Sequence, residues 1–339
     1  MLRPLLLAPL LLSFAFAVPA SAEQFRFDKQ ENTQTLSLFE GEAPIFSYIY
    51  DMIVHENVPQ NDHRRVAGCY IHPLYGLNGE ILTDNAPADH YHHRGVFWTW
   101  PYVSVHHPDG KIDRYDLWTS DTALKQRFVR WLEQTTTETT ATFAVENGWF
   151  VGHSTTGLPI TDNDEKIMKE VVRVVVHRPK TGDGLRTRAI DFYFVWTPID
   201  RPISLGGHAE RSYGGLTLRF RPVVEPNRQL AEPSAINVIT VPDGVAAEDL
   251  SNIRLPWASY TSRFGNDERR SGAAVFVPKT HPDYPPSWLT RHYGPLCIGW
   301  PGVEKQTFPP GEDIKLNYRI WIYDAPASVT QIERAYEEY

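Results

Sequence analysis

The densest group of side chains that could carry chemistry lies in one short run, PADHYHHRG, which places four cationic side chains within five residues. In an extended conformation, successive side chains point to opposite faces. His90, His92 and Arg94 would then share one face, with His93 on the other. The shared face could bind a carboxylate or a sulfate, and a neutral imidazole can take a proton near pH 7. We therefore predict that His93 is catalytic and that Arg94 binds substrate.

His90 and His92 have a second interpretation as metal ligands, because a His-x-His pair on a strand can reach one ion. A cupin-type site would normally continue with a glutamate, whereas here the chain runs into Phe97 and Trp98. The cofactor prediction is therefore limited to a divalent metal ion at this pair. Packing alone explains the run poorly, since each buried imidazole or guanidinium would need its own partner.

A second polar cluster, GGHAERSYGG, lies between paired glycines that suit tight turns or close approach to a ligand. Here we predict His208 and Tyr213 as catalytic acid or base groups and Arg211 as an anion anchor. A bulged strand with a solvated Glu210–Arg211 pair is the structural alternative.

A third cluster, WLTRHYG, combines an arginine, a histidine and a tyrosine before a proline. Tyr293 is a candidate catalytic phenol whose pKa Arg291 could lower. Arg291 and His292 are candidate substrate-binding residues, and so is Trp118, because aromatic rings suit the C–H faces of sugars. A loop held by Trp288 packing is the alternative reading of this cluster.

Composition excludes several classes of function. The 339 residues carry 33 basic and 41 acidic side chains, so the net charge of −8 disfavours a general nucleic-acid binder. No P-loop, dinucleotide-binding glycine fingerprint, Gly-x-Ser-x-Gly elbow or His-Glu-x-x-His motif occurs. No close carboxylate pair of the glycosidase type stands out either.

The first 22 residues predict a secretory signal peptide. Arg3 supplies the positive start, an apolar run follows, and Ala20-Ser21-Ala22 is a small-residue cleavage site. We therefore expect an exported protein, periplasmic or secreted, without a membrane span. Cys69 and Cys297 could pair in an oxidising compartment or remain buried thiols, and the sequence leaves both alternatives open.

The elements that must position these clusters are short strands. Apolar and β-branched runs recur between turn residues, and Ile190–Trp196 and Leu216–Arg221 alternate apolar and polar side chains as half-buried strands do. We predict an all-β fold, a large antiparallel β-sandwich of jelly-roll or mutarotase-like supersandwich form, over residues 23–339 as one domain. Few helices are expected, one of them over Ser328–Tyr339 with Ser328 as its N-cap.

Four blocks, in order along the chain, resemble the signature blocks of the PmoA-like family. The most specific is the His-x-His-His-Arg-Gly block, and the correspondence spans most of the mature chain. The four blocks are Tyr70–Tyr75, Asp89–Trp98, Tyr213–Leu216 and Pro286–Gly294.

The resemblance implies a β-sandwich protein of polysaccharide-degrading bacteria. Similar proteins in the ulvan-degrading branch are oligosaccharide dehydratases, which remove water from a terminal uronic acid and leave a 4,5-unsaturated sugar. The expected partner is then an anionic oligosaccharide. A glycoside hydrolase or sugar epimerase on the same fold, or a non-catalytic sugar-binding protein, are the alternatives. The residues on matching blocks are His90, His92, His93, Arg94, Tyr213, Arg291 and Tyr293, and His208 lies just before one.

This chemistry requires the residue types found. Removing the C5 proton of a uronate places negative charge on its carboxylate, which arginine, protonated histidine or a divalent cation can stabilise. We expect Arg94 or Arg291, with His90 and His92, to hold the carboxylate. His208 or Tyr213 would transfer protons.

Overall fold

The computed structural model describes residues 24–119, 123–152, 164–221, 223, 236–265 and 268–339. The signal peptide predicted over residues 1–22 lies outside this part of the chain. Within it, no helix is long and apolar enough to cross a membrane.

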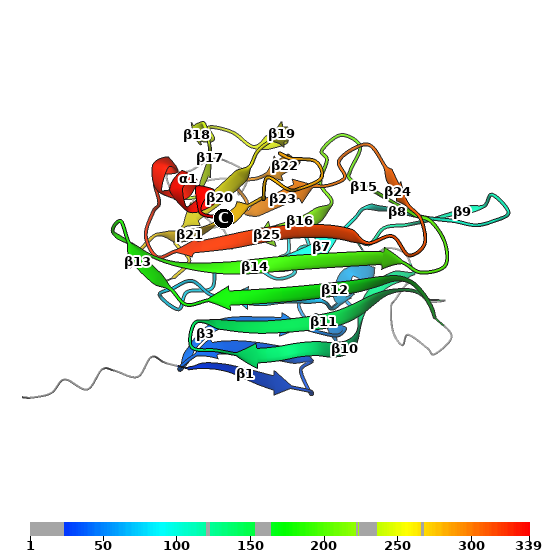
Figure 1. The fold of residues 1–339 in the computed structure, drawn as a ribbon, viewed down its shortest axis with the longest axis horizontal. Helices are drawn as coiled ribbons and strands as arrows, with labels where there is room; N and C mark the ends of the chain where they lie inside the picture. The colour runs from blue at the N-terminus through cyan, green and yellow to red at the C-terminus, as the bar shows by residue number, and fades with distance from the viewer. Residues whose placement is uncertain (1–23, 120–122, 153–163, 222, 224–235, 266–267) are drawn as a thin grey trace, which may run out of the picture.

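Two large antiparallel sheets make up most of the molecule (Figure 1). The nine-stranded sheet has the order β1 (Phe25–Gln30), β2 (Thr35–Glu40), β3 (Ala43–Ile49), β6 (Tyr70–Leu74), β7 (Val96–Thr99), β16 (Gly215–Arg219), β23 (Pro295–Gly299), β22 (Ser287–Thr290) and β19 (Leu250–Arg254). The ten-stranded sheet has the order β10 (Leu124–Thr136), β11 (Thr140–Val151), β12 (Glu165–His177), β14 (Leu185–Pro198), β25 (Ile314–Tyr323), β21 (Ser271–Phe276), β20 (Trp257–Ser262), β17 (Val238–Val241) and β18 (Gly244–Val245), with β13 (Lys180–Gly182) paired to β14.

Smaller elements surround the two sheets. A four-stranded sheet has the order β24 (Gln306–Phe308), β15 (Ile203–Gly206), β8 (Tyr102–His106) and β9 (Ile112–Tyr115). The remaining elements are a two-stranded pair, β4 (Ile53–Val54) with β5 (Val66–Ala67), a 3-10 turn η1 (His63–Arg65), and the helix α1 (Val329–Glu337). Ser328 caps α1 in a capping box with Gln331, which confirms the predicted helix and its N-cap.

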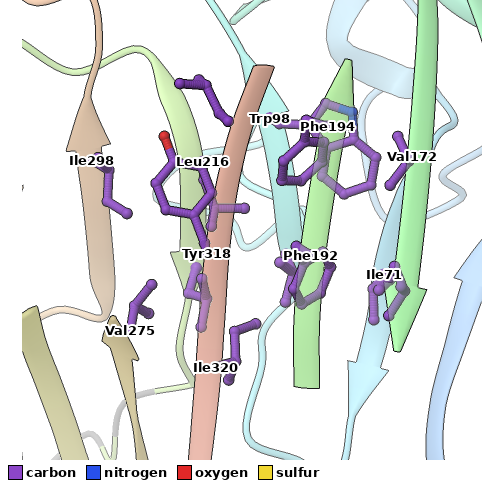
Figure 2. Packing of buried hydrophobic residues seen from close by; sticks show 14 of the residues in the cluster. Ile71, Trp98, Val172, Phe192, Phe194, Leu216, Val275, Ile298, Tyr318 and Ile320 are labelled. Carbon is purple, nitrogen blue, oxygen red and sulfur yellow. The ribbon is translucent and has the colours of Figure 1, made fainter. Parts of the chain in front are cut away.

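One apolar core fills the space between the sheets. In β14, Ile190, Phe192, Phe194 and Trp196 are all at most 1% exposed, and they face core residues of the other sheet such as Trp98 (Figure 2). The period-2 pattern in the sequence therefore predicted this face correctly. The all-β antiparallel sandwich is confirmed. Cys69 and Cys297 are both buried and unpaired, as in the buried-thiol alternative.

A fully buried carboxylate joins the two sheets. Glu170 on β12 is 0% exposed, and its two oxygens accept five hydrogen bonds from neutral N–H donors. The five partner groups are indole N–H and amide NH₂ groups, which can only donate. Both oxygens of Glu170 therefore act as acceptors, as in an ionised carboxylate. The donors are Trp98 Nε1 and Asn147 Nδ2 to Oε1, both at 2.9 Å, and Gln126 Nε2 (2.9 Å), Trp149 Nε1 (2.9 Å) and Trp196 Nε1 (2.8 Å) to Oε2.

We expect Glu170→Gln to lower the free energy of unfolding by about 3 kcal/mol. The NH₂ group of the glutamine would face the N–H donors that now bind the carboxylate, and no acceptor or water would replace the lost hydrogen bonds in the dry core. Denaturant unfolding followed by tryptophan fluorescence measures this loss. The matched control is Glu133→Gln, whose side chain is 34% exposed, and it should change stability by less than about 0.5 kcal/mol. Equal losses in the two variants would contradict the role of Glu170.

Candidate functional site

The outer face of the nine-stranded sheet supplies the floor of the site. On β7, β16 and β23, the alternate residues Trp98, Leu218 and Ile298 enter the core between the sheets. Their neighbours Phe97 and Cys297 therefore point the other way, where they form a second apolar cluster with Trp118 and Leu289. This small cluster lies under the loops that carry the polar side chains.

The three polar clusters of the sequence meet in one pocket on this face. Its cavity volume is about 160 Å³. The lining residues are His90, His92, His93, Trp118, Arg211, Tyr213, Leu289, Arg291, Tyr293 and Cys297. Eight of these ten were candidate site residues in the sequence, and they come from four distant segments, the three polar clusters and the stretch that contains Trp118.

The histidine run is turned, not extended. His90 N–H donates to the Pro87 carbonyl and His93 N–H to the His90 carbonyl, both at 2.9 Å. His90, His92 and His93 therefore line the same pocket, although an extended chain would separate His93 from the other two. Gly95 ends the run with φ 41°, and a Cβ there would collide with the Ile71 carbonyl oxygen, so only glycine fits.

Arg94 does not line the pocket, contrary to the expectation that it shares a face with His90 and His92. It is 5% exposed, and its guanidinium donates to the carbonyls of His92 (3.0 Å) and Arg64 (2.7 Å). It borders a separate cavity of about 30 Å³ beside Tyr70. Arg94 thus ties the histidine turn to η1, because it donates to one backbone carbonyl of each.

His90 forms a carboxylate–imidazole pair that the sequence analysis missed. Asp89 Oδ2 lies 2.9 Å from His90 Nδ1, and Arg219 donates to both oxygens of Asp89 at 3.0 and 2.8 Å. Burial acts to raise the pKa of Asp89, but the hydrogen bonds from His90 and Arg219 outweigh it and lower this pKa to about 2. An ionised carboxylate accepts the Nδ1 proton, so the neutral form of the His90 ring offers the lone pair of Nε2.

Arg219 is the second residue that the sequence analysis missed. The alternation of Leu216–Arg221 predicts that its side chain faces solvent, yet Arg219 is 1% exposed. Its guanidinium lies 4.8 Å from the ring centroid of Tyr293. The Tyr293 ring stacks on the His90 ring, with centroids 5.0 Å apart and 5° between the ring planes. The polar side of β16 is therefore buried beneath the pocket. The adjacent letters Asp89-His90 were the signal that could have revealed the pair.

His92 and His93 are held as neutral rings. Burial, followed by the nearby charges of His90 and Arg94, lowers the pKa of His92 to about 3. Burial and neighbouring cations also lower the pKa of His93 well below its usual value. Among the described residues, neither Nδ1 has a hydrogen-bond partner. An orphaned N–H is disfavoured more than an orphaned lone pair, so each ring offers Nε2–H as a donor.

Among the described residues, no third side chain is placed to complete a metal site with His90 and His92. The His90 and His93 rings stack in parallel, 4.6 Å apart with 3° between their planes, and His92 stands at 79° to His93. In the part of the chain that the structure describes, no group of three histidine, cysteine or acidic side chains is placed to hold a metal ion.

Two tyrosines bring phenols into the pocket. Tyr213 lies 4.7 Å from the Trp118 ring, and burial, followed by the charge of Asp116, raises the pKa of Tyr213 to about 12. Burial also raises the pKa of Tyr293 to about 12, although Arg219 and Arg291 act in the opposite direction. The expected lowering of the Tyr293 pKa by Arg291 is therefore overcome, and both phenols are protonated at neutral pH.

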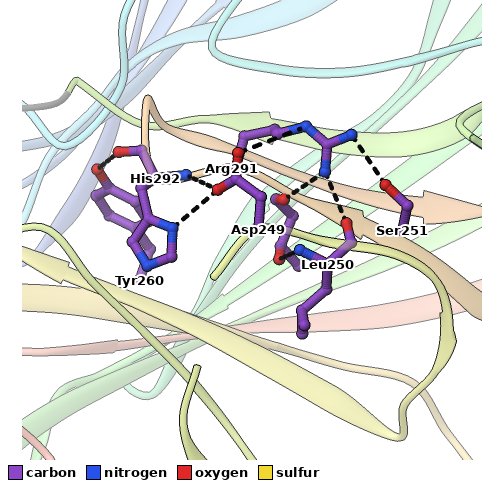
Figure 3. Close-up of polar contacts among 7 residues, drawn as sticks. Asp249, Leu250, Ser251, Tyr260, Arg291 and His292 are labelled. Atoms are coloured by element: carbon purple, nitrogen blue, oxygen red, sulfur yellow. Dashed lines mark hydrogen bonds and ion pairs between the residues drawn. The ribbon is translucent and has the colours of Figure 1, made fainter. Parts of the chain in front are cut away.

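The two arginines of the pocket differ in their polar contacts. Arg291 donates to the carbonyls of Leu250 (2.8 Å) and Thr290 (2.9 Å) and to Ser251 Oγ (2.9 Å), and its Nε lies 3.7 Å from Asp249 Oδ2 (Figure 3). Arg211 is exposed and has no hydrogen bond or ion pair to any other described side chain. Among the described side chains of the pocket, Arg211 is thus the guanidinium left to bind an anion, whereas Asp249 partly balances the charge of Arg291.

His292 and His208 lie outside the pocket lining. His292 is 1% exposed, with its Nδ1 and backbone N–H both 2.8 Å from Asp249 Oδ1, so it anchors the loop (Figure 3). His208 stacks on Tyr213 at 4.9 Å and accepts a hydrogen bond from the Glu210 amide at its Nδ1. Loop 207–214 reaches the pocket because Gly299 on β23 has no Cβ to block the Ser212 carbonyl.

Fold and site together define a β-sandwich protein with a cationic, aromatic pocket on the outer face of one sheet. The chain belongs to the family of unknown function DUF6807, whose model matches residues 35–337. A search of curated proteins found none that matches the chain. The function must therefore be argued from the pocket.

The Asp89 pair makes stability depend on pH in a defined direction. Because the folded pKa of about 2 lies below the usual value, the pair stabilises the fold above pH 4 and loses this effect as the pH falls towards 2. Asp89→Asn should therefore cost about 2 kcal/mol at pH 6, and the gap to wild type should shrink at pH 3. Denaturant unfolding at both pH values measures it. The exposed Asp243→Asn is the control, and a gap independent of pH would contradict the assignment.

Proposed function

We propose that this chain is an exported oligosaccharide dehydratase, a carbon–oxygen lyase that eliminates water from a terminal uronic acid to give a 4,5-unsaturated sugar. The observation that carries the proposal is the single pocket in which a carboxylate-paired histidine faces protonated phenols and a free arginine. Export rests on the leader predicted over residues 1–22.

The pocket suits an anionic sugar. Arg211 offers a guanidinium that has no partner among the described side chains, and Arg291 adds a positive charge that Asp249 partly balances. His92 and His93 offer neutral N–H donors. Trp118 provides an aromatic surface for the C–H face of the ring. Bound in this way, the carboxylate lies where negative charge develops when the C5 proton is removed.

His90 is the proposed base. Asp89 fixes the ring through Nδ1 and stabilises the imidazolium that forms, which leaves Nε2 to take the C5 proton. The electron pair of the broken C5–H bond forms the C4=C5 double bond, and the C4–O bond breaks. Tyr213 donates its phenolic proton to the departing hydroxyl, which leaves as water. The proton on His90 then returns to Tyr213 through solvent, which restores both residues.

A glycoside hydrolase is less well supported by the same pocket. Hydrolysis requires two carboxyl groups on either side of the scissile bond. The pocket lining, as far as the structure describes it, contains histidines, arginines and tyrosines but no aspartate or glutamate. Asp89 does not line the pocket, because its carboxylate binds His90 Nδ1 and accepts hydrogen bonds from Arg219.

We expect His90→Gln and Tyr213→Phe each to lower kcat by about 10²–10⁴, because each removes one proton-transfer group. The measurement is the ultraviolet absorbance of the unsaturated uronate formed from uronate-terminated oligosaccharides. His63→Gln, on the turn η1 and outside the pocket, is the control and should retain wild-type rates. If purified wild-type protein forms no chromophore from any such substrate, with or without added divalent metal, the proposed reaction is refuted.

Arg211→Gln should raise KM at least tenfold for the uronate substrate and change kcat less, because it removes a charge–charge contact made in both ground and transition states. Calorimetric titration with a uronate oligosaccharide and with its carboxyl-reduced neutral form tests the same point. Wild type should prefer the uronate, and the variant should lose most of that preference. An unchanged preference would show that Arg211 does not hold the carboxylate.

A further inference from the structure

A row of aromatic rings leads from the pocket to the molecular surface. Trp118 at the pocket floor is 3% exposed and lies 4.7 Å from Tyr213. Tyr213 stacks on His208, with ring centroids 4.9 Å apart and 20° between the ring planes. His208 in turn stacks on Tyr102, with centroids 6.4 Å apart and 26° between the planes. Tyr102, the outermost ring, is 36% exposed. The rings therefore continue beyond the pocket without a break.

The outer end of this row is built by the small sheet. Tyr102 is the first residue of β8 and pairs with Gly206, the last residue of β15, so His208 follows two residues later. Lys305 immediately precedes β24, which pairs with β15 on its other edge. A Cβ at Gly206 would meet the Lys305 side chain, so glycine lets the lysine stem lie across the strand end. The ends of the three adjacent strands β8, β15 and β24 therefore place Tyr102, His208 and Lys305 close together.

Lys305 adds charge to the outer rings. Its ammonium lies 5.1 Å from the Tyr102 ring centroid, and the residue is exposed. An aromatic ring beside a mobile ammonium can contact the C–H face of a sugar and also pair with an acidic group on that sugar. Nothing in the pocket mechanism uses Tyr102, His208 or Lys305.

We propose that Tyr102, His208 and Lys305 form a second sugar-binding subsite, which holds the residue next to the terminal uronate. Its occupant is a sugar that stacks on Tyr102 and places an anionic group at Lys305. This inference rests on the proposed function in taking an oligosaccharide as the ligand. It adds that the substrate extends out of the pocket along the small sheet and that chain length determines specificity.

The test compares Tyr102→Ala with wild type on two substrates, the methyl glycoside of the uronate and a uronate-terminated trisaccharide. We expect kcat/KM for the trisaccharide to fall about tenfold or more in the variant, and kcat/KM for the methyl glycoside to stay within twofold. The matched control is Tyr193→Ala, because Tyr193 is 39% exposed and, like Tyr102, lies beside a cationic side chain, in this case Arg173, but on the outer face of β14. Lys305→Met should weaken binding of a trisaccharide whose second residue is acidic and leave a neutral second residue unaffected.

The outcomes separate this inference from the proposed reaction. An equal effect of Tyr102→Ala on both substrates, or no effect on either, overturns the subsite while the reaction stands. If no substrate is turned over, calorimetric titration with the trisaccharide decides. Affinity that falls about tenfold in Tyr102→Ala and not in Tyr193→Ala supports the subsite although the reaction has failed, and equal affinities overturn the subsite as well.

Discussion

The buried carboxylate of Glu170 is the constraint on which the rest of the structure depends. Four of its five donors belong to the ten-stranded sheet, and the fifth, Trp98, comes from β7 of the other sheet. An uncompensated carboxylate in a dry core would cost many kcal/mol, so the donors must stay in place whenever the protein is folded. This requirement fixes β7 in register. The preceding residue, Phe97, points to the opposite face, where its ring centroid lies 5.1 Å from that of Trp118 and 6.1 Å from that of His93. The geometry of the pocket floor is thus set by a polar contact on the other side of the same strand.

A second buried charge, Arg219, organises the site itself. Its guanidinium pairs with Asp89 and lies over Tyr293, although two of its nitrogens have no hydrogen-bond partner among the described residues. Such a charge is a poor choice for stability alone, because an apolar side chain would fill the space without a desolvation cost. Its position is instead explained by what it aligns. One cation holds the carboxylate that orients His90 and also supports the ring on which His90 stacks.

The sequence could predict the scaffold better than the pocket, for a physical reason. Alternation identified the core face of β14 because Ile190, Phe192 and Phe194 are apolar and the side chains between them are mostly polar. The same rule failed at Arg219, since a polar face can be covered by loops as well as by water. The histidine run was expected to be extended, whereas local hydrogen bonds turn it and bring His93 to the side of His90. The choice of His90, His92, Tyr213 and Tyr293 needed only residue types, but the roles of Asp89 and Arg94 depended on directions that only the folded backbone supplies.

The charge of the pocket differs from that of the chain as a whole. The chain as a whole carries a net charge of −8, yet the pocket lining holds two arginines and three histidines, and two carboxylates beside it, Asp89 and Asp249, are paired with Arg219 and Arg291. Burial and neighbouring positive charges keep His92 and His93 neutral. An anion entering the pocket would oppose only the Coulombic part of that effect, because burial is its larger cause. A carboxylate bound at Arg211 would therefore meet these rings as neutral N–H donors, and the positive charge that balances it would come from the arginines.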